Sequence, residues 1–400
     1  MRVALVHDYI KEFGGAERVL KVLSEMYPNA PIYTAFSVKG STAEKEFRDR
    51  DIRESWLAPI LKIGNLYSPL RFLTPLIWGS MDLSEYDLVI TSSSWYITRG
   101  FRVGPKTLVI CYCHTPPRWL YGYETSVGFT KYWPVKVYSA IVGHFMRIYD
   151  FATAQKPKRS SKLRITNYKI TAGVDYFIAN SKNVQDRIKK FYRRDSIVIY
   201  PPVDTEKISA ISHRPLATDK KEDYFLTVSR LVGAKGLEEI VKVFRSKSMS
   251  KYKLKVVGEA AGFSAISNQL SDVSNSNIEI LGRVKDEELY ELYAGAKALI
   301  CLAKEEDFGL TPVEAMAAGT PVIAFNGGGY RESVIDGVTG ILINDTDEKT
   351  IKSAVLHFNE LIHQSGGKIE GSCKKQAKKF SKGRFVREIR EFVSSIQNQV

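Results

Sequence analysis

The sequence contains few cysteines and no long apolar run. Its four cysteines form no C-x-x-C pair, so their spacing suggests neither a zinc site nor a redox dithiol. No uninterrupted apolar stretch reaches the roughly 18–20 residues that a membrane-spanning helix requires. No signal-peptide pattern opens the chain, because Met1–Asp8 runs directly into a strand-like segment. These absences predict a reduced, cytoplasmic protein.

The chain has a large excess of positive charge. Its 58 lysine and arginine residues against 44 aspartate and glutamate residues give a formal net charge of +14. Such a balance favours anionic partners, namely phosphorylated small molecules, nucleic acid or the anionic leaflet of a membrane, although it also serves solubility alone. The cations gather in one cluster within residues 156–169 and a second within residues 374–384.

Short apolar runs alternate with helical patterns along the first half of the chain. The 400 residues are more than one ordinary core holds, so two domains are expected. Ala16–Met26 has the apolar spacing of a helix. The expected strands are Val3–Val6, Leu88–Ile90, Leu108–Ile110 and Tyr176–Ala179. Strands that alternate with helices predict a parallel sheet covered on both faces.

The alternation breaks near residue 200 and then restarts. Pro201-Pro202 ends the first part, and we place the interdomain linker in the polar stretch Thr205–Glu222. The second part has expected strands at Tyr224–Val228, Leu254–Val257, Ile278–Leu281, Ala298–Leu302 and Val322–Ala324, and helices at Leu237–Phe244, Asp286–Ala294 and Pro312–Ala318. A last helix near Arg384–Val393 is expected to cross back to the first domain.

This pattern predicts an α/β protein of two Rossmann-like domains that face a cleft. The first comprises residues 1–203 with residues 380–400, and the second comprises residues 204–379. Open α/β sheets bind ligands beyond the carboxyl ends of their strands, so the loops after the strands are where a site is expected.

The most distinctive motif is Glu305–Gly319, with the sequence E-E-D-F-G-L-T-P-V-E-A-M-A-A-G. We expect a loop and a short helix, with Thr311 as its N-cap and Gly319 just after its last turn. Glu314 follows Thr311 by three residues, which is the spacing of a capping box, so its structural interpretation is helix capping.

The same segment suits the binding of a phosphate, because the N–H groups of Gly309 and Leu310 lie at a helix N-terminus. The pattern in which seven residues separate Glu306 from Glu314 closely resembles the signature of glycosyltransferase family 4, whose members have the GT-B fold. The resemblance implies that Glu306 contacts the transferred sugar and that Glu314 contacts the ribose. It extends the donor-binding set to Phe308, Gly309, Leu310 and Thr311.

Other segments of the second half match the same family. Arg230 and Lys235 resemble its diphosphate-binding arginine and lysine, although two cations in a surface loop would look the same. Together they would neutralise the charge that builds on a departing nucleoside diphosphate. Arg283 and Val284 resemble the loop that packs on the nucleotide base. The resemblance makes the second domain the donor-binding domain and the first the acceptor-binding domain.

Two N-terminal segments complete the expected site. Gly14-Gly15 follows the first strand, where the family brings its backbone close to the donor phosphate and the acceptor, although a glycine pair is also common in turns. His114 follows a buried strand, and a lone histidine is most often structural. Here it matches the family's histidine that touches the donor sugar near the reacting carbon. The implied catalytic set is His114, Glu306, Arg230 and Lys235.

The segments His7-Asp8-Tyr9, Gly14–Arg18 and Cys113–Arg118 resemble the bacterial mannosyltransferases that build O-antigen and other surface polysaccharides. This implies retaining transfer of mannose from the nucleotide-sugar GDP-mannose to a saccharide or lipid-linked oligosaccharide, without nucleic acid as a partner. No D-x-D cluster is placed to hold the diphosphate, so we expect neither metal nor another cofactor.

From the sequence alone, three alternatives to this function remain open. A UDP-sugar donor would use the same residues. A GT-B nucleotide-sugar epimerase would convert the donor without any acceptor. A non-catalytic module that binds nucleotides or nucleic acid would use the basic clusters, and it would show strongly salt-dependent polyanion binding and no sugar turnover. A dehydrogenase is disfavoured, because no expected strand is followed by G-x-G-x-x-G.

The stretch Trp56–Trp78 is apolar and aromatic. Pro59, Pro69 and Pro75 interrupt it, so one long helix is not expected. It suits core packing, a lid or a membrane interface, where tryptophan and tyrosine are favourable. In the last case the basic residues 156–169 would lie over anionic headgroups or an acceptor pyrophosphate. We therefore expect peripheral attachment to the inner face of the cell membrane.

Overall fold

The computed structural model describes residues 1–64, 66–123, 133–156, 164–165, 168–169, 173–212, 223–229, 235–258, 277–365 and 367–397. These residues form two compact units. Unit 1 contains the described residues of Met1–Tyr123, Tyr132–Pro202 and the segment from Val386 onward. Unit 2 contains those of Val203–Phe385. The chain therefore passes from unit 1 to unit 2 between Pro202 and Val203 and returns between Phe385 and Val386.

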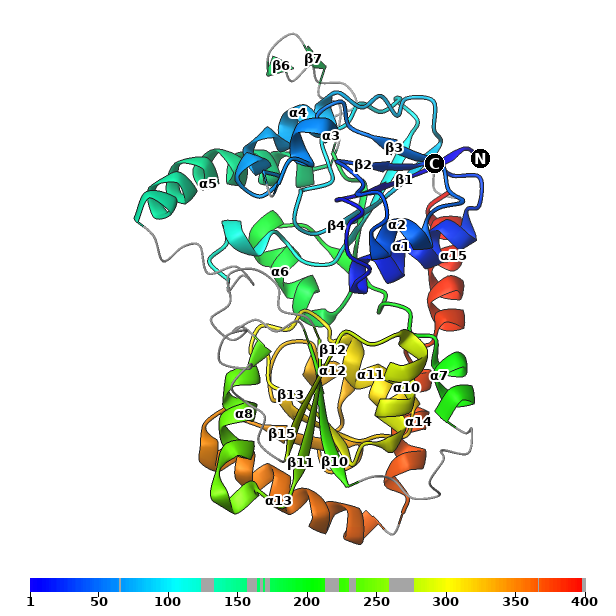
Figure 1. Cartoon of the computed structure of the whole chain (residues 1–400). Helices are drawn as coiled ribbons and strands as arrows, with labels where there is room; N and C mark the ends of the chain where they lie inside the picture. The colour runs from blue at the N-terminus through cyan, green and yellow to red at the C-terminus, as the bar shows by residue number, and fades with distance from the viewer. Residues whose placement is uncertain are drawn as a thin grey trace. The chain divides into compact units, whose positions relative to one another are not determined.

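Unit 1 is built on a seven-stranded sheet in which every pair is parallel (Figure 1). Its order is β3-β2-β1-β4-β5-β8-β9. The strands are β1 (Val3–His7), β2 (Ile32–Thr34), β3 (Ile52–Glu54), β4 (Leu88–Ser93), β5 (Leu108–Cys113), β8 (Tyr176–Ala179) and β9 (Ser196–Val198). All residues of β1, β4 and β5 are buried, as expected for strands covered on both faces.

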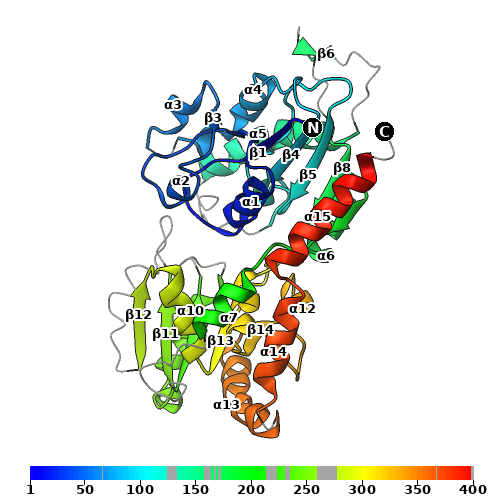
Figure 2. The ribbon, with the colours of Figure 1, turned by 90° about the vertical axis from the view of Figure 1, so that its right-hand side faces the viewer.

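Helices surround this sheet. They are α1 (Gly15–Met26), α2 (Thr42–Glu46), α3 (Ala58–Leu61), η1 (Pro69–Leu73), α4 (Thr74–Gly79), η2 (Arg118–Leu120), α5 (Trp133–Ala154) and α6 (Lys182–Tyr192). A two-stranded hairpin, β6 (Arg164–Ile165) and β7 (Tyr168–Lys169), is separate from the sheet. The last helix, α15 (Lys382–Gln397), belongs to unit 1 from Val386 (Figure 2). Phe392 of α15 meets Tyr176 of β8 edge to face at 5.8 Å.

Unit 2 repeats the plan with a six-stranded parallel sheet in the order β12-β11-β10-β13-β14-β15. Its strands are β10 (Tyr224–Val228), β11 (Lys253–Val257), β12 (Ile278–Gly282), β13 (Ala298–Cys301), β14 (Val322–Phe325) and β15 (Gly340–Ile343). Its helices are α7 (Thr205–Ser212), α8 (Leu237–Arg245), η5 (Lys247–Met249), α10 (Asp286–Gly295), α11 (Leu310–Ala317), α12 (Tyr330–Ser333), α13 (Glu348–Ser365) and α14 (Ile369–Lys378). Two Rossmann-like α/β units are thus confirmed.

The predicted linker at Thr205–Glu222 is wrong in its first part. Thr205–Ser212 forms helix α7 of unit 2. Thr205, Ile208 and Ile211 recur every three residues and are buried, which gives the helix an apolar stripe within a polar sequence. The rest of the predicted linker, residues 213–222, lies outside the described residues.

The described residues of the segment Trp56–Trp78 include three short helices, α3, η1 and α4, each with a proline in its first turn. The expectation that it is not one long helix is confirmed. Leu61 and Trp78 belong to the buried core of unit 1, whereas other side chains of the segment are exposed. Over the described part of the chain, no helix combines the length and the hydropathy that crossing a bilayer requires.

Candidate functional site

The carboxyl ends of the two central strands of unit 2 carry a charged pair. In the order β12-β11-β10-β13-β14-β15, strand order reverses between β10 and β13. Lys235 lies between β10 and α8, and Glu306 lies in the loop between β13 and α11. Ligands of open α/β sheets bind at such a reversal, so both residues lie where the topology favours a site.

Lys235 and Glu306 are in direct contact. The Lys235 Nζ atom lies 2.6 Å from Glu306 Oε2, and the two side chains are 23% and 17% exposed. Tyr330 Oη lies 3.5 Å from the same oxygen, a long and weak contact. The pair is therefore fixed in position while still reachable from solvent. Sequence reasoning assigned both residues to the donor but gave no sign that they touch.

A glycine run holds the Glu306 loop in place. Gly328 and Gly329 follow β14, and the Gly329 N–H donates to Glu306 O at 3.0 Å. A Cβ at Gly328 would lie 2.3 Å from Glu306 O, and one at Gly329 would lie 2.2 Å from Phe308 Cα. Only glycine permits this close approach of two backbones. Sequence reasoning missed these positioning residues, although three successive glycines after an expected strand were a signal.

Gly236 positions Lys235 in a similar way. It has a φ of +71°, and a Cβ there would lie 2.6 Å from Leu302 Cβ. The residue after Lys235 must therefore be glycine for the loop to lie against the end of β13. The Lys235-Gly236 dipeptide thus combines a charge with the backbone freedom that places it.

The capping-box interpretation of Glu314 is wrong. Helix α11 begins at Leu310 with Gly309 as its N-cap, so Thr311 is already inside the helix. Glu314 is buried, and its Oε2 accepts a hydrogen bond from Tyr293 Oη at 3.0 Å. The helix starts early because Gly309, with a φ of +83°, makes the turn that we assigned to a later residue. At the other end Gly319 has the predicted place after the last turn.

The first turn of α11 presents backbone N–H groups from Leu310 and Thr311, which have no partner four residues back within the helix. Phe308, just before this turn, is buried against Phe380 with ring centroids 5.3 Å apart. Its ring is therefore a packing group, and the part that it can offer to a ligand is its backbone.

The remaining donor residues are spread along the same edge of the sheet. Arg283 and Val284 follow β12, the edge strand, with Arg283 exposed and Val284 half-buried. Arg230 lies outside the described residues. The structure thus brings Lys235 and Glu306 into contact and places Arg283 and Val284 after a strand two positions away in the sheet.

In unit 1, a chain of hydrogen bonds links His114 to the Gly14-Gly15 turn. His114 Nε2 lies 2.8 Å from Ser92 Oγ, and Ser92 Oγ lies 3.0 Å from His7 Nδ1. His7 Nε2 lies 3.3 Å from Glu17 Oε1, and the Gly14 N–H donates to Glu17 Oε2 at 2.9 Å. These residues come from the ends of β1, β4 and β5 and from the first turn of α1. His7, Ser92 and Glu17 were not predicted as site residues.

The partners in this chain of hydrogen bonds limit where the protons can lie. A carboxylate can only accept, so His7 donates from Nε2 to Glu17. Ser92 Oγ lies between two imidazole nitrogens, so its hydroxyl can donate to one ring while it accepts from the other. In the tautomer that donates from Nε2 to Ser92, Nδ1 of a neutral His114 is a hydrogen-bond acceptor.

The neutral state of His114 has a physical cause. Burial, with a smaller contribution from His7, lowers the pKa of His114 from 6.5 to about 3. In the unfolded chain its pKa returns to 6.5. Between these values the unfolded chain binds a proton that the folded chain does not, so the stability contribution present above pH 6.5 is lost as the pH falls.

We therefore expect acid to destabilise unit 1 through His114. Between pH 6.5 and pH 5 this residue alone would remove roughly 1–2 kcal/mol of unfolding free energy. Urea unfolding at both pH values should show a smaller pH-dependent loss for His114→Asn than for the wild type. His357→Asn, at an exposed position on α13, is the control and should keep the wild-type dependence. An equal loss in wild type and His114→Asn would contradict the assignment.

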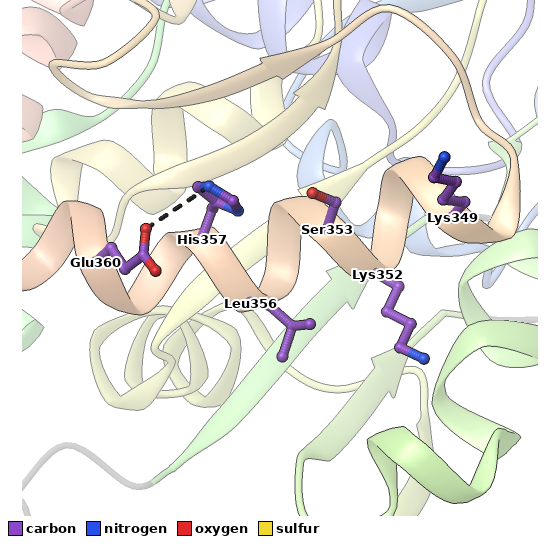
Figure 3. Close-up of a pocket in the computed structure, with 6 residues that line it drawn as sticks. All are labelled: Lys349, Lys352, Ser353, Leu356, His357 and Glu360. Carbon is purple, nitrogen blue, oxygen red and sulfur yellow. Dashed lines mark ion pairs between the residues drawn. The ribbon is translucent and has the colours of Figure 1, made fainter.

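Other features of the described surface do not add to the site. An open depression on α13 is lined by side chains of that one helix and by none of the predicted site residues (Figure 3). Burial raises the pKa of the Cys301 thiol to about 12, so it does not act as a nucleophile near neutral pH. Among the described residues, no group of three or more histidine, cysteine, aspartate or glutamate side chains could hold a metal. Metal independence stays a prediction.

Comparison with known proteins agrees with this arrangement. Residues 13–207 match the family model Glycosyltransferase Family 4, and residues 209–380 match Glycosyl transferases group 1. An uncharacterised glycosyltransferase of Methanocaldococcus jannaschii is 27% identical over 60% of this chain and 65% of its own length. The O-antigen chain mannosyltransferase RfbU of Salmonella typhimurium is 31% identical over 42% of this chain and 49% of its own length. The chain thus matches about half to two thirds of these relatives' lengths.

A solved structure shares the fold. Anabaena HepE in complex with UDP superimposes with a TM-score of 0.66 at 17% identity, over 99% of this chain and 100% of that chain. The two parallel sheets, the charged pair at the strand reversal and the two family models lead to one conclusion. The chain belongs to the glycosyltransferases of the GT-B fold, with an N-terminal half of family 4 and a C-terminal half of group 1.

Proposed function

We propose that this glycosyltransferase moves mannose from GDP-mannose onto a lipid-linked saccharide, with retention of configuration, in the synthesis of a surface polysaccharide. The observation that carries the proposal is the Lys235–Glu306 pair at the carboxyl ends of β10 and β13. The mannosyl and O-antigen parts are supported by the likeness to RfbU, whose name states both.

The pair supplies two complementary contacts to a nucleotide-sugar. Lys235, with Arg230, would pair with the diphosphate and stabilise the charge that grows on the leaving β-phosphate. Glu306 would accept hydrogen bonds from hydroxyls of the transferred sugar. The first turn of α11 would add backbone donors to the phosphate, and Glu314 would contact the ribose.

We propose a second set of contacts from unit 1. We assign His114 Nδ1 as an acceptor for a hydroxyl of the transferred sugar, with Ser92 and His7 holding its ring and tautomer. Gly14 and Gly15 begin α1, where the backbone can approach the phosphate and the acceptor.

The acceptor hydroxyl would attack the anomeric carbon of the sugar from the same face from which the diphosphate leaves. The bond between the anomeric carbon and the β-phosphate oxygen breaks, the acceptor oxygen bonds to that carbon, and the acceptor proton passes to the leaving phosphate. Glu306 is paired with Lys235. We propose that it serves as a sugar contact and not as a covalent nucleophile. Positioning and charge stabilisation would supply most of the rate. We propose that no metal or other cofactor takes part.

A thermal-shift titration tests the donor. GDP-mannose at about one hundred times its Kd should add about 2.7 kcal/mol and raise the melting temperature by roughly 5–10 °C. UDP-glucose at the same concentration should give a much smaller shift. Transfer from GDP-mannose should continue in excess EDTA.

Three results would change the proposal. A larger shift with UDP-glucose would move the donor to a UDP-sugar. Loss of transfer in EDTA that a divalent ion restores would refute metal independence. Conversion of the donor into an epimer without an acceptor would favour the epimerase.

The acceptor proposed here is lipid-linked, so we also propose that the protein works at the inner face of the cell membrane.

A further inference from the structure

Helix α5 exposes a continuous apolar stripe. Its residues lie three or four positions apart and are between 50% and 75% exposed: Trp133, Val137, Ile141, Phe145 and Ile148. At 100° per residue they fall within about 120° of arc, so they form one face of the helix. Figure 1 shows α5 along the outside of unit 1, with its first turns projecting beyond the sheet. A soluble protein rarely leaves so many large apolar side chains together in water.

The opposite face of α5 is firmly attached to unit 1. Asp150 is fully buried and pairs with Arg99, and it accepts hydrogen bonds from Tyr121 Oη at 2.7 Å and Tyr192 Oη at 3.2 Å. Met146 is buried among Ile97 and Leu120. Since these contacts fix the rotation of the helix, the apolar stripe necessarily faces away from its own core.

The segment Trp56–Trp78 adjoins α5 and adds to this surface. Tyr138 of α5 donates a hydrogen bond to the carbonyl of Pro69 in η1. The large apolar side chains that the segment leaves exposed are Trp56, Ile60, Ile63, Leu66, Phe72 and Leu76. Two neighbouring elements of one unit therefore present apolar groups to solvent.

The charges on these elements have one sign. In sequence, residues 56–78 contain no aspartate or glutamate, and residues 133–154 contain only Asp150, which is buried against Arg99. The cations on α5 are Lys136 and Arg147, both exposed. An apolar stripe with a tryptophan at one end and only cations beside it is the pattern of a helix that lies in the interface of an anionic bilayer.

We infer that the exposed face of α5, with the adjoining α3–α4 segment, docks this protein onto an anionic lipid bilayer. The apolar side chains enter the boundary between headgroups and acyl chains, and Lys136 and Arg147 lie at the headgroups. The inference rests on the proposed function, because a lipid-linked acceptor requires the enzyme to work at a bilayer. It goes beyond that function by identifying α5, with the adjoining α3–α4 segment, as the part of the protein that contacts the bilayer.

Vesicle co-sedimentation of the full chain tests this inference. Wild-type protein is expected to bind vesicles of phosphatidylcholine with phosphatidylglycerol, and to bind phosphatidylcholine alone more weakly. The double substitution Ile141→Ser with Phe145→Ser should lower the partition coefficient about tenfold or more, because both side chains lie mid-stripe. Leu356→Ser is the matched control, since Leu356 is an exposed apolar residue of α13 in unit 2, and it should bind like the wild type.

Parallel measurements separate the outcomes. The melting temperature and the donor-induced thermal shift of the double variant should equal those of the wild type, because the substituted side chains are exposed. Equal vesicle binding by wild type and double variant would overturn the inference. The inference would also be overturned if light scattering found that the wild type is a dimer and the double variant a monomer. The stripe would then bind a second copy of the chain. If GDP-mannose does not raise the melting temperature of wild-type protein that still binds vesicles, the proposed function is rejected and the bilayer contact stands.

Discussion

Replacing Glu306 by glutamine is expected to reduce kcat/KM for transfer by about 10²- to 10³-fold, the effect typical of losing one preorganised polar contact in a transition state. Glutamine keeps the shape but removes the charge that Lys235 meets at 2.6 Å. Lys235→Ala should cost a similar factor, because the leaving diphosphate would lose a cation. The measurement is steady-state transfer of radiolabelled mannose.

A matched control shows whether the loss belongs to the site. Glu360→Gln makes the same chemical change at an exposed position on α13 and should leave kcat/KM unchanged. The Glu306–Lys235 pair is partly exposed, so breaking it should alter stability by no more than about 1 kcal/mol. Turnover within twofold of wild type in a folded Glu306→Gln protein would remove Glu306 from the catalytic set.

Asp150→Asn is expected to destabilise unit 1 by about 3–5 kcal/mol, because it leaves the Arg99 guanidinium buried without a counter-charge. Both side chains are almost wholly inaccessible, at 2% and 0% exposure. The substitution also weakens the acceptor that Tyr121 and Tyr192 share. Chemical unfolding followed by circular dichroism measures the change.

The control for this prediction is another aspartate in an ion pair. Asp195 pairs with Lys189 at 2.7 Å but is 93% exposed, so Asp195→Asn should cost less than about 1 kcal/mol. Removing both charges, in Arg99→Met with Asp150→Leu, should restore part of the stability lost in Asp150→Asn. Equal stability of Asp150→Asn and wild type would mean that burial of this pair has no energetic importance.

The sequence was most informative where a strand is buried on both faces. Tyr176–Ala179 and Tyr224–Val228 were predicted with the bounds that the structure has, because apolar runs this short and rich in aromatic and β-branched residues favour a strand over a buried helix. Strands β2 and β3 have three residues each, too few to show a period, and were not predicted. Helix α5 was missed because its apolar residues occupy both its inner and its outer face, which hides the amphipathic pattern.

The candidate site also has parts that the sequence predicted and parts that it did not. The spacing of Glu306 and Glu314 identified the family, since that signature is long. Contacts between distant segments were not accessible, because nothing local relates Ser92 to His7 and His114, or Tyr293 to Glu314. The glycines at 328 and 329 are required by a backbone approach that only the folded chain reveals.

Helix α15 has a consequence for the synthesis of the protein. Unit 1 takes its sheet from residues up to Pro202, yet it includes the chain from Val386 onward. Ile389, Val393 and Ile396 of that helix are buried, and Phe392 meets Tyr176 of β8. The apolar surface of unit 1 beside β8 is therefore covered only after residues 386–397 have been translated, and these follow the whole of unit 2 in the chain. Transiently exposed apolar surface promotes aggregation, so we expect this side of unit 1 to be vulnerable while unit 2 is being synthesised.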